Sequence, residues 1–375
     1  MRFVKTLVVS SSLVILAAFV SLQGGQDRSG PGSSLAAAKP SGPFSIVDAA
    51  GRTVRLEKPP ARIVVAGRGS HIVLHLLYLF PGGKARLAGT ERWADPASDF
   101  IPLIDPDFGR VPIMEPNAGA EEIAAMRPDI VLTRGSSVNW ISESLDKVNI
   151  PVVYLGLETP EQYFRDLENL GILLGDTPRA MEISNFYRTR LDRIAKGTSN
   201  LGTADKPRVL LVMWTERGGK AAVRVPAEGW IQTNQVRMAG GAPVWLDASL
   251  ESGGWTVVNL EQIAAWNPDM IFIVVWHTLD SAKILDSLKA DPRWSGLKAL
   301  RSGNLRVFPA DVYGWDSPDP RWILGVMWLA AKVHPDIFKD IDMTDEVRRF
   351  YGELYGMDKQ AVADKIMPTI KMDIR

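Results

Sequence analysis

Arginine and tryptophan recur where apolar, β-rich runs of the sequence end. Arg68 follows the run ARIVVAG, Arg134 closes DIVLTR, Trp214 closes RVLLVMW and Trp276 closes DMIFIVVW. In an open α/β sheet, ligands bind beyond the carboxyl ends of the strands, so we expect these side chains to face a common cleft. Guanidinium groups bind carboxylate, catecholate or hydroxamate oxygens in pairs, and aromatic faces cover apolar surface. This chemistry fits the capture of a bulky, oxygen-rich ligand such as a metal chelate.

The candidate ligand-binding residues lie at expected strand ends and in the loops that follow them. They are Arg68, Arg92, Trp93, Arg134, Trp214, Arg217, Trp230, Trp276, His277, Tyr313, Trp315 and Arg321. The chain has 12 tryptophans, and five belong to this set. Any single tryptophan also fits plain core packing, and any single arginine a solvated loop. In the segment VYGWDSPDPRW we expect Tyr313 and Trp315 to reach the cleft, while His277 and Tyr313 are weak candidates for direct ligation of iron.

The order of elements predicts an α/β fold. Strand-like runs rich in Val, Ile and Leu alternate with helical patterns, which is typical of parallel sheets covered on both faces. Two long amphipathic, strand-free segments interrupt this order between Pro160 and Lys196, after which it resumes. We therefore predict two Rossmann-like lobes with parallel sheets joined by a long α-helix. The expected parts are a signal peptide and flexible tail (1–38), an N-terminal lobe (39–159), connecting helices (160–197) and a C-terminal lobe (198–375).

One phrase occurs twice, 140 positions apart. EEIAAMRPDIVLTR begins at Glu121 and EQIAAWNPDMIFIV begins at Glu261. Each copy is typical of a helix followed by a buried strand, with its glutamate in the first helical turn. The helix dipole alone favours a carboxylate there. A duplicated lobe would instead place the two glutamates at equivalent sites, one on each half of the molecule.

These features together resemble the class III periplasmic substrate-binding proteins. The resemblance rests on an apolar N-terminal segment, the phrase PARIVVAG, the repeated E-x-I-A-A-x-x-P-D-[IM] and a long connecting helix, and it covers roughly residues 44–367. The family serves ABC importers of ferric siderophores, haem and vitamin B12. It implies a binding protein without a cofactor or catalytic residue, in which Glu121 and Glu261 contact permease subunits in the inner membrane. A single stiff connector implies modest lobe closure.

The composition and the N-terminus bear on partners and location. Lys+Arg and Asp+Glu both number 43, and no basic patch suggests nucleic acid. Cysteine is absent, which excludes disulfides, thiolate metal sites and lipid attachment at a cysteine. A short basic segment, the uncharged run Thr6–Leu22 and a stretch rich in Gly, Ser and Ala are typical of a secretory signal. We expect a monomer exported to the periplasm; an uncleaved membrane anchor is the alternative.

Several competing interpretations remain open. His71 and His75 are spaced i, i+4 and could bind a free or weakly chelated transition metal. Haem, a corrinoid, or a simpler nickel, cobalt or oxyanion ligand could take the place of an iron–siderophore complex. An exported chelate-processing enzyme is less favoured, because no nucleophile elbow, phosphate loop or zinc hydrolase motif is found. Gly67-x-Gly69 lacks the third glycine of a dinucleotide loop.

Overall fold

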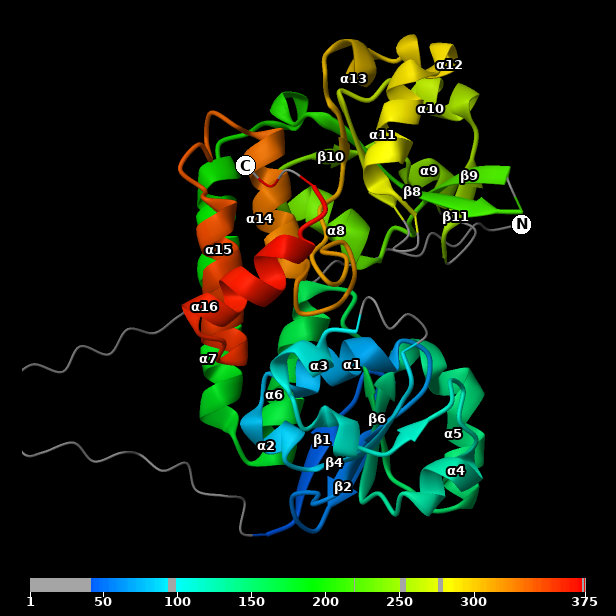
Figure 1. Ribbon diagram of the computed structural model, residues 1–375, viewed down its shortest axis with the longest axis vertical. Helices are drawn as coiled ribbons and strands as arrows, with labels where there is room; N and C mark the ends of the chain where they lie inside the picture. Colours follow the sequence, from blue (N-terminus) through cyan, green and yellow to red (C-terminus); the bar gives the residue numbers. More distant parts are fainter. Residues whose placement is uncertain are drawn as a thin grey trace, which may run out of the picture. The chain divides into compact units, whose positions relative to one another are not determined.

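The protein is described by a computed structural model covering residues 42–93, 99–218, 220–249, 254–275, 279–372 and 374. The predicted signal peptide and tail (1–38) lie outside the described residues, as do Trp276 and His277. Within the part that is described, no helix combines the length and apolar character needed to cross a membrane. Two β-sheets with their helices, and the segment that connects them, make up the fold (Figure 1).

The first sheet has five strands, all parallel, in the order β5-β4-β3-β6-β7. Its strands are β3 (Ile63–Val65), β4 (Leu87–Glu91), β5 (Ile113–Met114), β6 (Ile130–Arg134) and β7 (Val152–Leu155). The sequence predicts four of them; β5 has two residues and is too short to show a pattern. A separate antiparallel hairpin, β1 (Phe44–Val47) and β2 (Thr53–Leu56), precedes the sheet.

The second sheet is mixed, which corrects the prediction of a purely parallel one. Parallel strands β8, β12 and β13 carry an antiparallel extension, β9 and β11, and the order is β11-β9-β8-β12-β13 with β10 also paired to β8. The bounds are β8 (Arg208–Arg217), β9 (Lys220–Val225), β10 (Ala242–Pro243), β11 (Thr256–Val258), β12 (Met270–Val275) and β13 (Leu305–Val307). A hairpin allows β9 to return directly beside β8, so no crossover helix separates these two strands.

Helices flank both sheets and fill the connection between them (Figure 1). In the first part of the chain they are α1 (Ser70–Leu77), α2 (Pro81–Lys84), α3 (Ile101–Ile104), α4 (Ala120–Ala125), α5 (Val138–Lys147), α6 (Pro160–Leu174) and α7 (Thr177–Thr198). Later come α8 (Ile231–Met238), α9 (Leu246–Ser249), α10 (Leu260–Trp266), α11 (Ser281–Ala290), α12 (Pro292–Ser295), α13 (Lys298–Arg301), α14 (Trp322–Val333), α15 (Met343–Arg349) and α16 (Lys359–Ala361).

The predicted long connecting helix is α7. It has 22 residues and is therefore about 33 Å long at 1.5 Å per residue. The Asp176 side chain accepts a hydrogen bond from the Arg179 amide at its start, and Pro178 lies in its first turn, where its missing N–H is no loss. Helix α14 packs against α7, and its residues are buried on almost every side, as expected of a helix that is apolar all round.

The two copies of the repeated phrase form the same arrangement of a helix followed by a strand. In each copy the residue before the proline, Arg127 or Asn267, takes a left-handed conformation (φ 50 and 42) that ends the helix. The aspartate after the proline then accepts a hydrogen bond from the backbone at the start of the neighbouring strand. Asp129 accepts it from the Arg62 amide, and Asp269 accepts it from the Arg208 amide. The arginines at these two strand starts also donate to the last carbonyls of the helices, α4 and α10.

Candidate ligand-binding site

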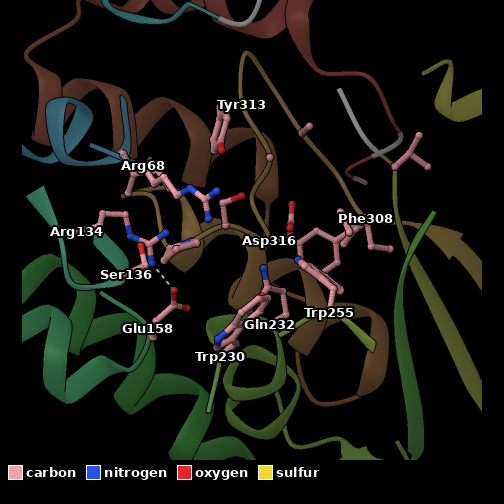
Figure 2. A pocket seen from close by; sticks show the side chains of 18 of the residues that line it. Arg68, Arg134, Ser136, Glu158, Trp230, Gln232, Trp255, Phe308, Tyr313 and Asp316 are labelled. Atoms are coloured by element: carbon pink, nitrogen blue, oxygen red, sulfur yellow. Dashed lines mark hydrogen bonds and ion pairs between the residues drawn. The ribbon is translucent and has the colours of Figure 1, made fainter. Parts of the chain in front are cut away.

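A cavity of about 670 Å³ opens where the loops after the strands of both sheets meet (Figure 2). We call it the interlobe pocket. The first sheet contributes the loops after β3, β6 and β7, and the second contributes the ends of β8 and β12, the start of α8 and the loop from Phe308 to Pro318. This is the strand-end position predicted from the sequence. Its volume lies within the range typical of small-molecule sites, about 300–1,000 Å³.

Arg68 reaches the pocket from a tight turn after β3. Its neighbours Gly67 and Gly69 have φ of 92 and 71, a conformation that residues with a Cβ rarely adopt. A Cβ on Gly67 would also lie 2.5 Å from the Thr133 hydroxyl oxygen. The turn leaves Arg68 exposed, and no ion pair to it is found among the described residues. Its guanidinium is thus available for a ligand oxygen.

Arg134, at the end of β6, forms the second cationic group of the lining. Its guanidinium donates to Glu158 Oε1, and the other carboxylate oxygen, Oε2, accepts from the Ile231 amide at 3.3 Å. Glu158 therefore joins the first sheet's loops to the start of α8. Arg134 Nε is buried and lacks a hydrogen-bond partner in the part of the chain that is described. A ligand acceptor would satisfy it.

Asp316 and Gln232 lie together in the lining, apart from the two arginines (Figure 2). Asp316 is 8% exposed and Gln232 is 5% exposed. Burial raises the pKa of Asp316 to about 6, although the Gln232 side chain opposes the shift. Gln232 Oε1 is buried without a hydrogen-bond partner in the described structure. Trp255 and Phe308 adjoin this pair, and the Trp230 and Trp255 rings meet edge to face at 5.7 Å.

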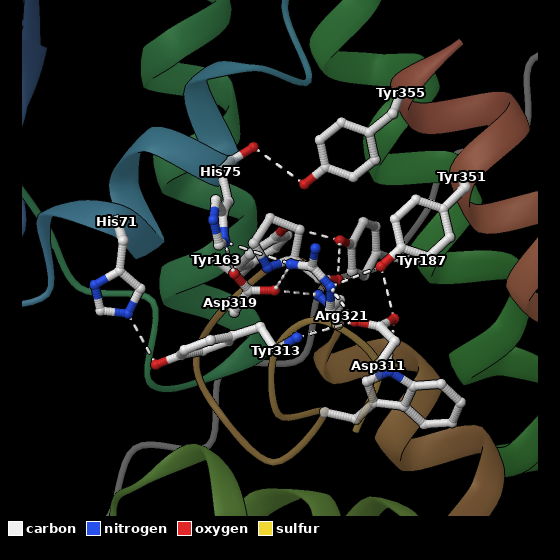
Figure 3. A network of polar contacts seen from close by, with 12 residues as sticks. His71, His75, Tyr163, Tyr187, Asp311, Tyr313, Asp319, Arg321, Tyr351 and Tyr355 are labelled. Atoms are coloured by element: carbon white, nitrogen blue, oxygen red, sulfur yellow. Dashed lines mark hydrogen bonds and ion pairs between the residues drawn. The ribbon is translucent and has the colours of Figure 1, made fainter. Parts of the chain in front are cut away.

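A buried polar network holds the loop that carries Tyr313 and Asp316 (Figure 3). Arg321 lies at its centre and is fully buried: it donates through Nε to Asp311 at 2.9 Å and through Nη1 to Asp319 at 2.7 Å. Burial opposes ionisation of Asp319, but the Arg321 charge and the His75 side chain outweigh it and lower the pKa of Asp319. Asp311 also accepts from Tyr351 and from Trp315 Nε1. The loop therefore has a fixed shape.

Four predicted residues lie in the pocket lining: Arg68, Arg134, Trp230 and Tyr313. Trp315 and Arg321 belong to the network behind the loop instead, each fully buried. For Trp276 and His277, and for the side chain of Arg217, the prediction falls outside the described residues. The remaining three, Arg92, Trp93 and Trp214, lie outside the lining and contact other residues.

Arg92 pairs with Glu115 at 3.0 Å, and Trp93 packs on the His71 ring with centroids 3.7 Å apart. Trp214 Nε1 donates to Glu216 at 3.1 Å. Sequence reasoning missed several lining residues, notably Gln232, Trp255, Glu158, Phe308 and Lys371. Gln232 and Trp255 belong to no predicted strand end, since the first lies on a helix and the second precedes the unpredicted strand β11. No pattern in the sequence analysis pointed to Trp255.

Tyr313, a predicted weak candidate for iron ligation, lies beside the two histidines of the alternative site for a transition metal, His71 and His75. His71 Nε2 and the Tyr313 hydroxyl lie 2.8 Å apart, and burial raises the pKa of the Tyr313 phenol. The ring of His75 is bonded to Asp319. Among the residues that the structure describes, no group of three or more His, Asp or Glu side chains converges as a metal ion would need. His71 and His75 are thus held by side chains on the Tyr313–Arg321 loop.

Comparison with known proteins identifies relatives of this fold. A family model described as periplasmic binding protein matches residues 105–312, more than half of the chain. The molybdate-binding protein MolA of Haemophilus influenzae is 24% identical over 253 residues, which is 63% of this chain and 69% of MolA. The chain also resembles the solved structure of a periplasmic solute binding protein of Veillonella parvula (TM-score 0.66, 21% identity, 87% and 99% covered). Helicobacter pylori CeuE, solved as a nickel–histidine complex, gives TM-score 0.67 at 17% identity, covering 86% and 99%.

Proposed function

We propose that this chain, which belongs to the periplasmic binding protein family, captures a metal chelate in the interlobe pocket and delivers it to a membrane permease. The chain is a solute-binding protein of an ABC transporter and not an enzyme, as the sequence predicts. Our proposal concerns the cargo, which we infer to be an iron–siderophore complex, and the surface that meets the permease.

The observation that carries the proposal is the pairing of two guanidinium groups with an aromatic wall. Arg68 and Arg134 offer N–H groups to oxygen atoms, and Trp230, Trp255 and Tyr313 offer flat apolar surface. A ferric hydroxamate or catecholate complex presents both kinds of surface: ligand oxygens around the metal and an organic backbone around them.

Cavity size favours a chelate over a small oxyanion. The relative MolA binds molybdate, a tetrahedral ion that would occupy only a small part of a 670 Å³ cavity. CeuE was solved with a nickel–histidine complex, an organic chelate. A bulky complex excludes more water from the aromatic surface, which favours binding by about 25 cal/mol for each Å² of apolar surface removed from water.

Exposed glutamates at two equivalent positions support the docking assignment. Glu121 and Glu261 lie in the first turns of α4 and α10, and both are exposed. The matching hydrogen bonds of Asp129 and Asp269, each eight residues after its glutamate, support equivalent positions of Glu121 and Glu261 in the two lobes. We propose that each binds a basic residue of one permease subunit, with the chain exported to the periplasm by its N-terminal segment.

A ligand panel tests the proposed cargo. Tryptophan fluorescence of the purified chain is titrated with ferrioxamine B, a ferric catecholate complex, haem, cobalamin, nickel–histidine and molybdate. We expect saturable quenching by at least one ferric chelate, at lower concentration than by any other compound. Tight binding of molybdate alone would replace the proposal with an oxyanion receptor, and tight binding of haem or cobalamin would replace it with a tetrapyrrole receptor.

A further inference from the structure

Two hydrogen-bond acceptors converge in one part of the interlobe pocket. Both Asp316 and Gln232 line the cavity and both are more than nine-tenths buried. No ion pair to the Asp316 carboxylate is found in the described structure, where the Gln232 side chain is its hydrogen-bonding neighbour, and Gln232 Oε1 has no hydrogen-bond partner there. A buried acceptor without a donor, such as Gln232 Oε1, is unfavourable by about 1–3 kcal/mol, so the bound state should supply a donor. We propose that this acidic end of the pocket binds a protonated amine or similar cationic group of the ligand.

The local structure is built around the Asp316 carboxylate. A Cβ on Gly314 would lie 2.5 Å from Asp316 Oδ1, so glycine leaves the space that the carboxylate fills. The buried arginines nearby are committed elsewhere: Arg321 binds Asp311 and Asp319, and Arg134 binds Glu158. Neither arginine therefore neutralises the Asp316 carboxylate, which can receive a cation that enters the cavity.

Aromatic side chains complete the acidic end. Trp255 and Phe308 line the cavity beside Gln232 and Asp316 (Figure 2). The face of an aromatic ring attracts a cation, and it does so more strongly where water is excluded. An acid, an amide oxygen and aromatic rings together form the kind of environment that recognises an alkylammonium group.

The pocket thus has two chemically different ends. Arg68 and Arg134 favour ligand oxygens, whereas Asp316 and Gln232 favour a donor or a cation. We infer a dipolar cargo: a metal chelate that carries a free amine away from its metal-binding oxygens. This inference rests on the proposed function and narrows its ligand class. A bare oxyanion satisfies only the arginine end and would be repelled by Asp316.

One matched pair of chelates tests the inference. Ferrioxamine B carries a free primary amine, and its N-acetyl derivative has the same ferric hydroxamate core without the positive charge. Isothermal titration at pH 7.5 measures both against the wild type, Asp316→Asn and Asp192→Asn. The last is a control, since Asp192 is exposed on α7 and lies outside the lining.

We expect wild type and Asp192→Asn to bind ferrioxamine B at least tenfold more tightly than the acetylated form. In Asp316→Asn this preference should vanish, because the affinity for ferrioxamine B falls by at least tenfold. Equal affinity of the wild type for both chelates would overturn the inference and leave the proposed function standing. If the wild type binds neither chelate, the inference is contradicted, while the proposed function stands if another ferric chelate of the panel binds and fails if none does.

Discussion

The imidazole of His75 donates through Nδ1 to the carboxylate of Asp319, two residues 244 positions apart in the chain. His75 lies on α1, among the helices of the first sheet, and Asp319 lies in the loop that precedes α14. Both are almost completely buried. Near them Tyr187 of α7 donates to the Pro320 carbonyl, and Tyr351 of the C-terminal segment donates to the Asp311 carboxylate. The pocket loop is thus fastened from α1, from the connecting helix and from the C-terminal segment.

Removing the central cation of this network should destabilise the protein strongly. In Arg321→Met, Asp311 and Asp319 lose their positive partner while remaining fully buried. Loss of one partner of a buried ion pair lowers the free energy of unfolding by about 3–5 kcal/mol. Urea denaturation followed by circular dichroism measures the difference.

Arg293→Met is the matched control, because Arg293 is mostly exposed and pairs with Asp291 at the surface. Its effect on the free energy of unfolding should stay within about 1 kcal/mol. A loss in Arg321→Met no larger than in this control would show that the network does not hold the loop.

Asp316 should make the stability of the empty protein depend on pH. Burial raises its pKa to about 6, and the nearby charge of Asp319 acts in the same direction. A raised carboxyl pKa means that the folded state favours the protonated form. The contribution of this group to the free energy of unfolding is therefore present at low pH and is lost as the pH rises through about 6. Asp316→Asn removes the buried charge and should raise the melting temperature at pH 8.

The gain at pH 8 corresponds to a free energy on the order of 3 kcal/mol, and it should shrink severalfold near pH 4, where the carboxyl is protonated in the folded protein and only partly ionised in the unfolded chain. Differential scanning fluorimetry from pH 4 to pH 8 follows this. A difference between variant and wild type that does not change with pH would contradict the assignment of the charge to Asp316.

Arg68 should contribute to affinity and not to stability. It is exposed and no ion pair to it is found in the described structure, so truncation leaves no buried partner behind. Arg68→Ala should weaken binding of the best chelate of the panel by about tenfold or more, as expected for a charge-assisted hydrogen bond. The melting temperature should not move. Arg110→Ala, which alters an exposed arginine outside the lining, is the control; equal affinity in the two variants would exclude Arg68 from the site.

The docking assignment predicts a separation of binding from transport. Reversing both charges, Glu121→Lys with Glu261→Lys, should abolish uptake of the radiolabelled chelate by cells and leave its affinity for the purified chain unchanged. Glu143→Lys with Asp286→Lys is a control of equal charge change at two other exposed positions. Uptake that survives in the first variant, or is lost equally in the second, would refute the assignment.

Local patterns were sufficient to predict much of this fold. The strands β3, β4, β6, β7, β8, β12 and β13 coincide with apolar runs, and Pro178 marks the start of α7 as its chemistry requires. The hairpin of β8 and β9 was missed because the sequence KAAVRV does not alternate between polar and apolar residues, and it contains few strongly apolar ones.

The site was harder to predict than the fold. Strand ends located Arg68 and Arg134, but a strand end says nothing of which way a side chain turns in a loop. Trp315 and Arg321 share a segment with Tyr313. Of these three, Trp315 and Arg321 lie in the buried network, and Tyr313 lines the pocket. Gln232 enters the site from a helix, through tertiary packing that no local pattern records.

The most direct test of the account is to locate the metal. Crystals grown with the ferric chelate that binds most tightly are measured at the iron absorption edge, and the anomalous difference map gives the position of the iron. The account predicts one strong peak inside the interlobe pocket, between the Arg68 guanidinium and the Trp230 ring, with the ligand's oxygen atoms toward the arginines. A peak anywhere else on the chain, or chelate bound with the pocket empty, would contradict it.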